Sequence, residues 1–411
     1  MNSNNTIPDK TAGYIHTEEQ YGAHNYHPLP VVLSKGLGPL VWDVEGKRYY
    51  DFLSGYSAVN QGHCHPKIIR ALTEQAQLLT LTSRAFHSDK MAEYTAYVTK
   101  FFGYEKVLPM NTGVEAVETA IKLARKWGYE KKGIPDGMAT IITVEGNFHG
   151  RTVNVISFST DDGAKQGFGP FVGGYVTVPY NDITALEKAL ENKHVAAFLV
   201  EPIQGEAGVY VPDEGYLSRA AELCRTHRVL FMADEIQTGL CRTGKLLACD
   251  HEGVRPDVLI LGKALSGGTL PISAVLADDD VMLCIRPGEH GSTYGGNPLA
   301  CAVAIASLEV LIAENLAQRA EELGAYFRTL IQDIAHPALL TIRGKGLLNA
   351  IVIRHKDPNA ATLLCMELMK RGLLAKPTHG DKIRFAPPLV ISKEQLVEAA
   401  EIIRASFAVL D

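Results

Sequence analysis

Two short apolar runs in the middle of the chain constrain its fold most strongly, because each is followed by a side chain capable of chemistry. Val258–Leu261 is typical of a buried strand and leads to Lys263 in a glycine-rich turn. A second apolar run begins at Val229 and ends at Asp234. Open α/β sheets bind ligands at the carboxyl ends of their strands. The sequence therefore predicts a sheet that carries a lysine and an acid along one edge.

Lys263 and Asp234 are together suited to one kind of cofactor chemistry. A lysine beside a buried strand is partly desolvated, which lowers its pKa and allows its amine to form an imine with an aldehyde. A carboxylate can keep a pyridine nitrogen protonated, which lets pyridoxal phosphate (PLP) act as an electron sink. Taken singly, Lys263 could instead be a solvated residue at a strand end. Asp234 could likewise be a helix cap or a turn residue.

Residues 110–127 add a predicted helix whose start could bind a phosphate. The apolar residues with helical spacing are Val114, Val117, Ile121, Ala124 and Trp127. Thr112 is a suitable N-cap, and Gly113 leaves backbone amides open to an anion. Capped amphipathic helices are common, so this signal gains weight only beside the lysine and the acid.

Five motifs together resemble the class III, subgroup II aminotransferases of PLP fold type I. They are TGVEA at residues 112–116, EPIQGE at 201–206, ADEIQTG at 233–239, GKALSGG at 262–268 and STYGGNP at 292–298. The resemblance runs from about Tyr14 to the C-terminus. It implies an α/β PLP-dependent transferase of fold type I, with a large domain built on a mostly parallel seven-stranded sheet and a smaller α+β domain.

The alternation of strands and helices itself predicts a mostly parallel sheet covered on both faces. We expect residues 1–70 to form a mobile N-terminal arm and part of the small domain, 71–310 the large PLP-binding domain, and 311–411 the C-terminal small domain. Within these, residues 39–52 should form a hairpin. Residues 272–276 should form a strand, placed as an antiparallel edge strand. Residues from 298 to about 323 should form one long amphipathic helix.

The resemblance implies that PLP binds covalently to Lys263, with Asp234 at the ring nitrogen and Gln237 near the ring hydroxyl. Phe148 would stack on the ring, although ordinary core packing is the alternative. The loop with Ser292 and Thr293 would clamp the phosphate from the neighbouring subunit, so that the active site requires a homodimer. The implied cofactor-binding set is Thr112, Gly113, Val114, Phe148, Asp234, Gln237, Lys263, Ser292 and Thr293. Lys263 and Asp234 are the expected catalytic residues.

The same resemblance implies a set of substrate-binding residues. Tyr26 would meet the substrate carboxylate and Tyr56 would line the side-chain slot, whereas Arg151 would pair with the α-carboxylate through its planar fork. Glu206 would neutralise Arg384 for a diamine substrate and release it for a dicarboxylate. A surface arginine at position 151 and a permanent salt bridge between the other two are the plainer alternatives.

The resemblance implies transfer of the δ-amino group of L-ornithine to 2-oxoglutarate, as part of arginine and proline metabolism. Acetylornithine and 4-aminobutyrate are the alternative amino donors. Members acting on acetylornithine tend to carry arginine where this chain has His27, which favours free ornithine. The family often has tryptophan where this chain has His149, so the role of that position is open. A PLP-dependent mutase or decarboxylase and a non-catalytic binding protein are the further alternatives.

Composition excludes several other classes of protein. The 411 residues are 46% hydrophobic, enough for a large core. A net charge of −6 without a basic stripe argues against nucleic acid, and no apolar run is long enough to span a bilayer. Seven cysteines without a repeated CxxC spacing indicate a reducing compartment. Near the N-terminus, the first 20 residues lack arginine and an apolar segment, so we expect a cytoplasmic location, a removed presequence being the alternative.

The triplet His63, Cys64 and His65 offers zinc ligands, but no second ligand pair follows at a suitable spacing. We therefore expect no metal, and a histidine-rich turn before a helix that starts near Pro66.

Overall fold

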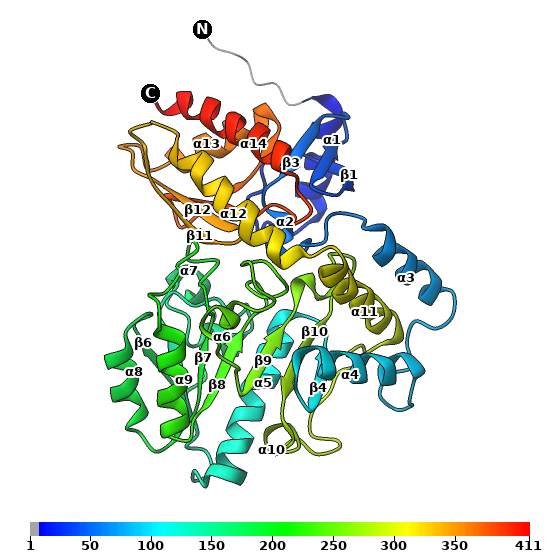
Figure 1. Cartoon of the computed structure of the whole chain (residues 1–411), viewed down its shortest axis with the longest axis vertical. Helices are drawn as coiled ribbons and strands as arrows, with labels where there is room; N and C mark the ends of the chain where they lie inside the picture. Colours follow the sequence, from blue (N-terminus) through cyan, green and yellow to red (C-terminus); the bar gives the residue numbers. More distant parts are fainter. Residues whose placement is uncertain (1–7) are drawn as a thin grey trace.

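A seven-stranded sheet forms the centre of the larger lobe in the computed structural model, which describes residues 8–411 (Figure 1). The strands, in spatial order, are β4 (Lys106–Met110), β10 (Ser273–Ala277), β9 (Val258–Leu261), β8 (Leu230–Asp234), β7 (Val195–Val200), β5 (Thr140–Val144) and β6 (Tyr175–Val178). Strand β10 runs antiparallel to both of its neighbours, and the pairs from β9 to β6 are parallel. The predicted mostly parallel sheet is thus confirmed.

The position predicted for the antiparallel strand is wrong in one respect. Strand β10 is antiparallel as expected, but it lies second in the sheet, and β4 forms the edge. The register pairs Ser273 with Met110, and the Ser273 hydroxyl donates a hydrogen bond to the Thr112 carbonyl at 2.7 Å. Because β10 also pairs with β9, this strand holds the turn after β4 beside the turn that carries Lys263.

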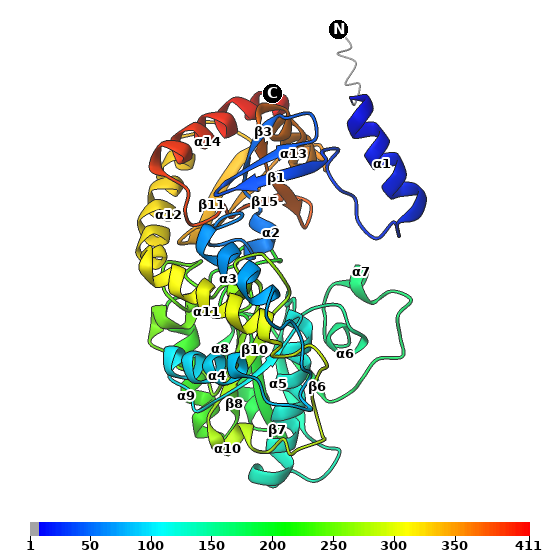
Figure 2. The same ribbon diagram turned by 90° about the vertical axis from the view of Figure 1, so that its right-hand side faces the viewer.

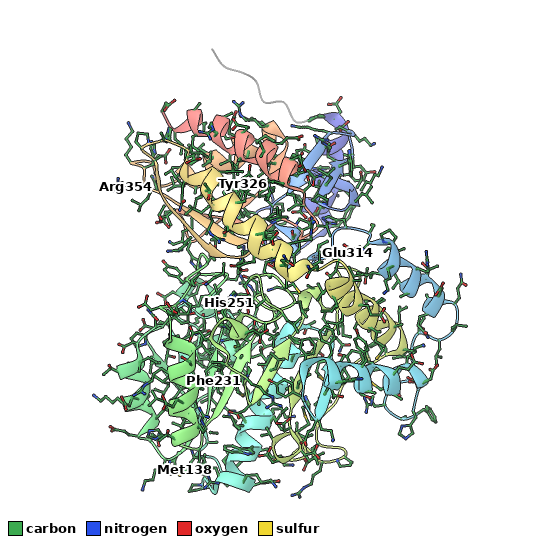
Figure 3. All side chains as sticks on the ribbon, in the orientation of Figure 1. Met138, Phe231, His251, Glu314, Tyr326 and Arg354 are labelled. Atoms are coloured by element: carbon green, nitrogen blue, oxygen red, sulfur yellow. The ribbon has the colours of Figure 1, made fainter. Side chains whose placement is uncertain are left out.

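Alternate residues of the central strands face two separate helical layers. Leu199 and Met232 pack against α5 (Gly113–Trp127) on one face. Phe198 and Phe231 point to the other face, where α8 (Ile183–Leu190) and α9 (Tyr216–Thr226) cover them. Figure 3 shows Phe231 in the middle of this lobe. Because both faces are buried, these strands are apolar throughout and not alternating.

The smaller lobe is built from the two ends of the chain. The first of its sheets has the order β1 (Leu33–Leu37), β2 (Leu40–Asp43), β3 (Arg48–Asp51) and β13 (Leu373–Leu374), and the second has the order β11 (Leu339–Lys345), β12 (Leu348–Ile353), β15 (Lys382–Phe385) and β14 (Lys376–Thr378). Strands β2 and β3 form the predicted hairpin, and β3 pairs in parallel with β13. Helices α13 (Ala360–Arg371) and α14 (Lys393–Ser406) cover this lobe.

Two expectations about helices are corrected. The long helix expected after Pro298 is two helices, α11 (Pro298–Ala313) and α12 (Leu316–Gln332), which are bent by 59° relative to each other and lead from one lobe to the other (Figures 1 and 3). The break lies at Asn315, whose φ of 54° cannot continue a right-handed helix. The arm expected at the N-terminus forms helix α1 (Asp9–Tyr21) instead. Residues 1–7 of the arm lie outside the described part of the chain.

The remaining helices are α2 (Ser54–Ser57), α3 (Pro66–Ala76), α4 (Asp89–Phe102), α6 (Val153–Ile156), α7 (Asp162–Lys165) and α10 (Asp279–Met282). The helix expected near Pro66 is confirmed as α3.

Within residues 8–411, no single helix has the length and apolar composition needed to cross a membrane. Helices α11 and α12 would meet that test only if taken together across their bend.

Candidate active site

Lys263 follows β9 and borders a cavity of about 260 Å³. Burial lowers the pKa of its amine below the ordinary value, although the charges of Glu206 and Asp234 act in the opposite direction. The backbone of Lys263 has a φ of 44°, a region that non-glycine residues seldom adopt. The cavity is lined by Gly113, Val114, Phe148, His149, Gly150, Arg151, Glu201, Asp234, Ile236, Gln237 and Lys263. An amine with a lowered pKa in such a cavity is suited to react with an aldehyde.

The start of α5 borders the same cavity. Thr112 caps the helix by accepting a hydrogen bond from the Glu115 amide at 3.3 Å, and the Glu115 carboxylate accepts one from the Thr112 amide at 2.7 Å. This capping box leaves the amides of Gly113 and Val114 without carbonyl partners in their own helix. A Cβ at Gly150 would overlap Val114, so that glycine lets the loop after β5 approach the turn. Open amides at a helix N-terminus are suited to bind an anion, and the phosphate contact predicted for Gly113 and Val114 stays a prediction.

Two acids at the ends of β7 and β8 hold the loop that follows β5. Asp234 is buried, and its Oδ2 lies 2.7 Å from His149 Nδ1. Glu201 is also buried, and its carboxylate accepts a hydrogen bond from the Phe148 amide at 2.8 Å. Burial raises the pKa of Glu201 to about 7, against the opposing charge of His149. Sequence analysis did not identify Glu201 as part of the site, although its position directly after β7 was an available signal.

Glu206, Arg384 and Gln237 form one polar cluster beside the lysine. Arg384 Nη1 donates to Glu206 Oε1 at 2.9 Å and to Gln237 Oε1 at 3.2 Å, while Gln237 Nε2 donates to Glu206 Oε1 at 3.1 Å. Burial would raise the pKa of Glu206, but the charges of Arg384 and Lys263 outweigh it and the net shift is downward. The expected pairing of Glu206 with Arg384 is therefore present. The contact expected between Gln237 and the ring hydroxyl stays a prediction.

The remaining substrate residues surround this cluster at different depths. The Tyr56 ring lies 4.9 Å from the Arg384 guanidinium, whereas Tyr26 is 60% exposed and lies 5.8 Å from the Lys376 amine. Arg151 is exposed and lies 5.7 Å from the Phe148 ring. The structure thus brings Tyr56 to the buried cluster and leaves Tyr26 and Arg151 at its solvent side.

The loop with Ser292 and Thr293 lies near the phosphate turn of its own chain. Ser292 Oγ accepts a hydrogen bond from Asn111 Nδ2 at 2.7 Å, directly before Thr112. Thr293 is exposed. Whether this loop serves its own site or that of a second subunit stays a prediction.

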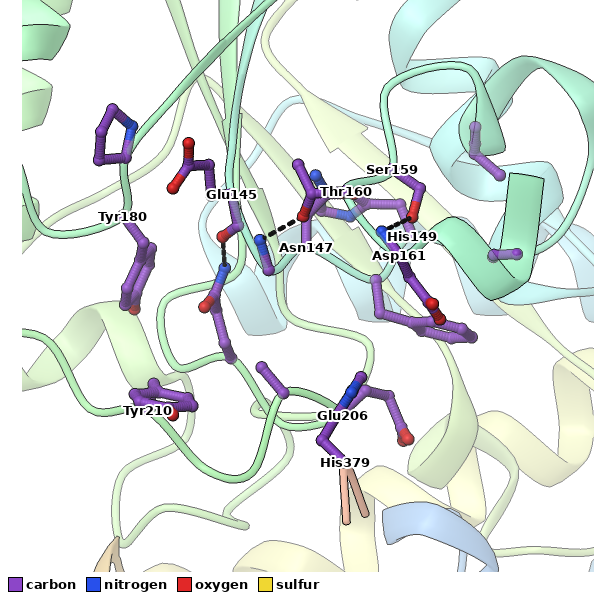
Figure 4. Close-up of a pocket in the computed structure, with 18 of the residues that line it drawn as sticks. Glu145, Asn147, His149, Ser159, Thr160, Asp161, Tyr180, Glu206, Tyr210 and His379 are labelled. Atoms are coloured by element: carbon purple, nitrogen blue, oxygen red, sulfur yellow. Dashed lines mark hydrogen bonds between the residues drawn. The ribbon is translucent and has the colours of Figure 1, made fainter. Parts of the chain in front are cut away.

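A larger cavity of about 870 Å³ adjoins the one at Lys263 (Figure 4). The two share the loop residues 148–151, and the larger one also reaches Glu206 and, from the small lobe, His379 and Lys382. The start of this loop is held by Gln204, whose side chain donates a hydrogen bond to the Glu145 carbonyl at 2.6 Å. The larger cavity therefore lies directly beside the one that Lys263 borders.

The residues around the smaller cavity fit PLP. That cofactor has an aldehyde, a phosphate and a basic ring nitrogen, and the cavity offers an amine with a lowered pKa, open helix amides and a buried carboxylate. The histidines of the triplet make other contacts, since His63 pairs with Asp51 and His65 with Glu314. Among residues 8–411, no group of three or more potential ligands is arranged to hold a metal ion.

The fold and this site are those of a PLP-dependent transferase of fold type I. The family described as "Aminotransferase class-III" matches residues 21–407, so the chain belongs to this family. Members of the family use PLP.

Individual relatives narrow the comparison. The chain is 60% identical over 396 residues to the mitochondrial ornithine aminotransferase of Rattus norvegicus, covering 96% of this chain and 90% of that protein. Its fold matches the crystal structure of ornithine aminotransferase from Toxoplasma gondii with a TM-score of 0.94 and 51% identity, covering 97% and 95% of the two chains. It also matches acetylornithine aminotransferase from Elizabethkingia anophelis with a TM-score of 0.89 and 56% identity, covering 97% and 99%.

Proposed function

We propose that this chain transfers the δ-amino group of L-ornithine to 2-oxoglutarate with PLP as cofactor. The products are glutamate and glutamate-5-semialdehyde, which cyclises to pyrroline-5-carboxylate. The observation that carries the proposal is the Glu206–Arg384 pair at 2.9 Å beside Lys263, because a neutralised arginine suits a substrate end without a carboxylate. The identity of 60% to the rat ornithine aminotransferase supports the same substrate.

We assign the proton transfers to Lys263. PLP, when bound, supplies an electron sink for the charge left on the carbon that loses its proton. The Lys263 amine, whose pKa is lowered by burial, would take the proton from the δ-carbon of ornithine and would next act as the acid that gives this proton back. With the cofactor bound, Asp234 would keep the ring nitrogen protonated, Phe148 would pack on the ring face, and the amides of Gly113 and Val114 would hold the phosphate.

The substrate ends are held by the residues around the polar cluster. Arg151 and Tyr26, at the solvent side, bind the α-carboxylate of ornithine, and Tyr56 lines the slot for its side chain. When 2-oxoglutarate enters, Glu206 releases Arg384, which then binds the second carboxylate. The Nε of Arg384 is buried without a hydrogen-bond partner among the described residues, so the guanidinium keeps a donor available. A Glu206→Gln variant that kept the wild-type rates with both substrates would contradict this exchange.

Acetylornithine is the second candidate substrate. The observation that favours it is the 56% identity to the Elizabethkingia anophelis acetylornithine aminotransferase. His27, directly after Tyr26, argues against it, because an imidazole lacks the planar fork of the arginine expected there. 4-Aminobutyrate is the third candidate.

We further propose that the protein works as a cytoplasmic homodimer in arginine and proline metabolism, with domains at residues 1–70, 71–310 and 311–411. Helix α1 and the segment with α6 and α7 project from the same side of the chain (Figure 2). They carry large exposed apolar side chains, namely Tyr14, Tyr21, Phe168 and Phe171. Such projecting apolar surface is typical of a contact with a second subunit. The seven cysteines, all within the described residues, are free, as in a reducing compartment.

The test mixes the PLP-loaded enzyme with L-ornithine alone and follows the visible absorption of the bound cofactor. Pyrroline-5-carboxylate is trapped with o-aminobenzaldehyde. We expect loss of absorption together with the coloured adduct for ornithine, and much slower changes for N-acetylornithine and 4-aminobutyrate. Loss of absorption without the adduct, or a faster reaction with N-acetylornithine, would overturn the assignment.

A further inference from the structure

His149 and Asp234 form a buried pair with complementary hydrogen-bonding groups. The His149 side chain has no exposed surface, and Asp234 is 5% exposed. An ionised carboxylate only accepts hydrogen bonds, so the His149 Nδ1–H donates to Asp234 Oδ2 at 2.7 Å. Asp234 Oδ1 accepts from the Ile236 amide at 3.0 Å. Each carboxylate oxygen is thus fixed by one donor and keeps a lone pair for a further partner.

The loop that carries His149 is tied to the strand ends at two consecutive residues. The His149 ring bonds to Asp234 after β8, and the Phe148 amide bonds to Glu201 after β7. The imidazole also lies 5.9 Å from the Phe158 ring, which closes its other side. One histidine therefore sets both the direction of the Asp234 carboxylate and the position of the residue whose ring faces the cavity.

Electrostatics add a second reason for this pair. Burial alone would lower the pKa of His149, but its hydrogen bond to Asp234 and the charge of that carboxylate raise it overall. The raised pKa of His149 therefore arises from the same hydrogen bond that fixes the direction of the carboxylate. A carboxylate with a fixed direction is a suitable partner for a pyridine nitrogen.

We propose that His149 is a positioning residue for the cofactor. It acts through Asp234, whose carboxylate it aims at the position of the PLP pyridine nitrogen, and it helps to place the Phe148 ring at the cofactor face. The proposal rests on PLP lying over Asp234 and not on ornithine being the substrate. This site thus relies on a residue that does not itself touch the reacting atoms.

The test compares two substitutions of similar size. His149→Leu removes the donor, whereas His149→Asn keeps an N–H close to the position of Nδ1. The control is His336→Leu, which removes the histidine of a different histidine–carboxylate pair. His336 lies 3.1 Å from Asp411 near the C-terminus. The apoenzymes are titrated with PLP to give its dissociation constant, a measurement that needs no amino acid substrate.

We expect His149→Leu to weaken PLP binding about 10-fold or more, as the loss of one charge-assisted hydrogen bond predicts. His149→Asn should stay within about threefold of wild type, because one donor is retained. His336→Leu should bind PLP normally. A His149→Leu variant that binds PLP as wild type would overturn the proposal. An Asn variant as weak as the Leu variant would do the same, because ring packing would then account for the effect.

A measurement on the unaltered protein covers the case in which His149→Leu does not fold. In enzyme labelled with ¹⁵N-histidine, a strongly hydrogen-bonded Nδ1 proton should give a far-downfield resonance that is absent from His149→Asn. PLP should shift this resonance as the pyridine nitrogen approaches Asp234. A resonance that PLP leaves unmoved would contradict the proposed link between His149 and the cofactor.

Discussion

The chemistry assigned to Lys263 requires a neutral amine inside the cavity. We predict that Lys263→Ala folds but loses turnover by at least about a thousandfold, because no other amine lines the cavity at Lys263 among the described residues. It should also lose the visible absorption of the bound cofactor. The control is Lys132→Ala, since burial lowers the pKa of Lys132 to about 8 but its amine donates only to the Val195 and His227 carbonyls. That variant should lose stability and keep its turnover, and a fully active Lys263→Ala would contradict the assignment.

Glu201 gives a prediction about pH. Its pKa is raised from 4.5 to about 7, so between these values the folded protein binds a proton that the unfolded chain releases. Stability should therefore fall as pH rises through this window, by about 3 kcal/mol in total. Glu201→Gln removes this contribution, so the variant should gain thermal stability relative to wild type between pH 5 and pH 8.

The measurement is the Tm of the apoenzymes at several pH values. Glu206→Gln is the matched control, because the pKa of Glu206 is lowered and it stays ionised over the same range. The difference in Tm between Glu206→Gln and wild type should therefore not change with pH. A flat difference for Glu201→Gln as well would show that Glu201 is ionised throughout.

Residues that carry a strong local signal could be predicted from the sequence. Lys263, Asp234 and the turn at Thr112 each follow an apolar run or open a helix, and the structure gathers Lys263, Asp234 and Gly113 around one cavity. The contacts of Gln237 and the pairing of His149 with Asp234 could not be predicted. They join side chains far apart in the chain, and no spacing rule in a single sequence records such contacts.

At the scale of elements, burial explains both the successes and the errors. Strands buried on both faces stand out as apolar runs, so β8 and β9 were predicted almost to the residue. Helix α11 is apolar around most of its circumference. Its sequence therefore has no one-sided apolar pattern, and no shift in such a pattern could mark where α11 ends and α12 begins.

The break between α11 and α12 can be tested at Asn315. Its φ of 54° is tolerated by glycine and asparagine but strained for a β-branched residue. We predict that Asn315→Val lowers the free energy of unfolding by about 1–2 kcal/mol, whereas Asn315→Gly changes it little. Both variants lose the hydrogen bond from Asn315 to Gln318. The difference between their free energies of unfolding therefore reports only the backbone strain at residue 315. Equal stabilities in urea unfolding would contradict this explanation of the break.

At the scale of the whole molecule, one buried arginine joins the two lobes. Arg242 is fully buried and bonds to Asn60 Oδ1 at 2.5 Å, to the Leu347 carbonyl at 3.0 Å and to the Pro387 carbonyl at 2.6 Å. Burial lowers its pKa to about 9. Pro387 follows the strand that carries Arg384, so Arg242 links the loop after β8 to the substrate cluster.

We predict that Arg242→Met lowers the free energy of unfolding by about 3 kcal/mol, because three buried acceptors lose their donor. It should also raise the KM for 2-oxoglutarate more than that for ornithine, since the position of Arg384 changes. The control is Arg404→Met, which alters an exposed arginine on α14 and should change neither quantity. An Arg242→Met variant with wild-type stability would contradict this role.

The joining of the two chain ends in one lobe is also a whole-molecule property. The pairing of β3 with β13 brings together residues more than 300 positions apart. Local sequence patterns predicted β3 as part of a hairpin, but they did not predict that β3 also pairs with β13. Such a pairing depends on the complete fold. The seven-stranded sheet and the small lobe were instead expected through resemblance to a family.

In the proposed reaction, the δ-amine of ornithine, and not its α-amine, gives its nitrogen to 2-oxoglutarate at Lys263. The most direct test supplies L-ornithine labelled with ¹⁵N at the δ-position and follows the label by mass spectrometry. We predict ¹⁵N-glutamate and unlabelled pyrroline-5-carboxylate in equal amounts. Unlabelled glutamate with the label retained in the cyclised keto acid would mean that the α-amine reacts and would contradict δ-amino transfer.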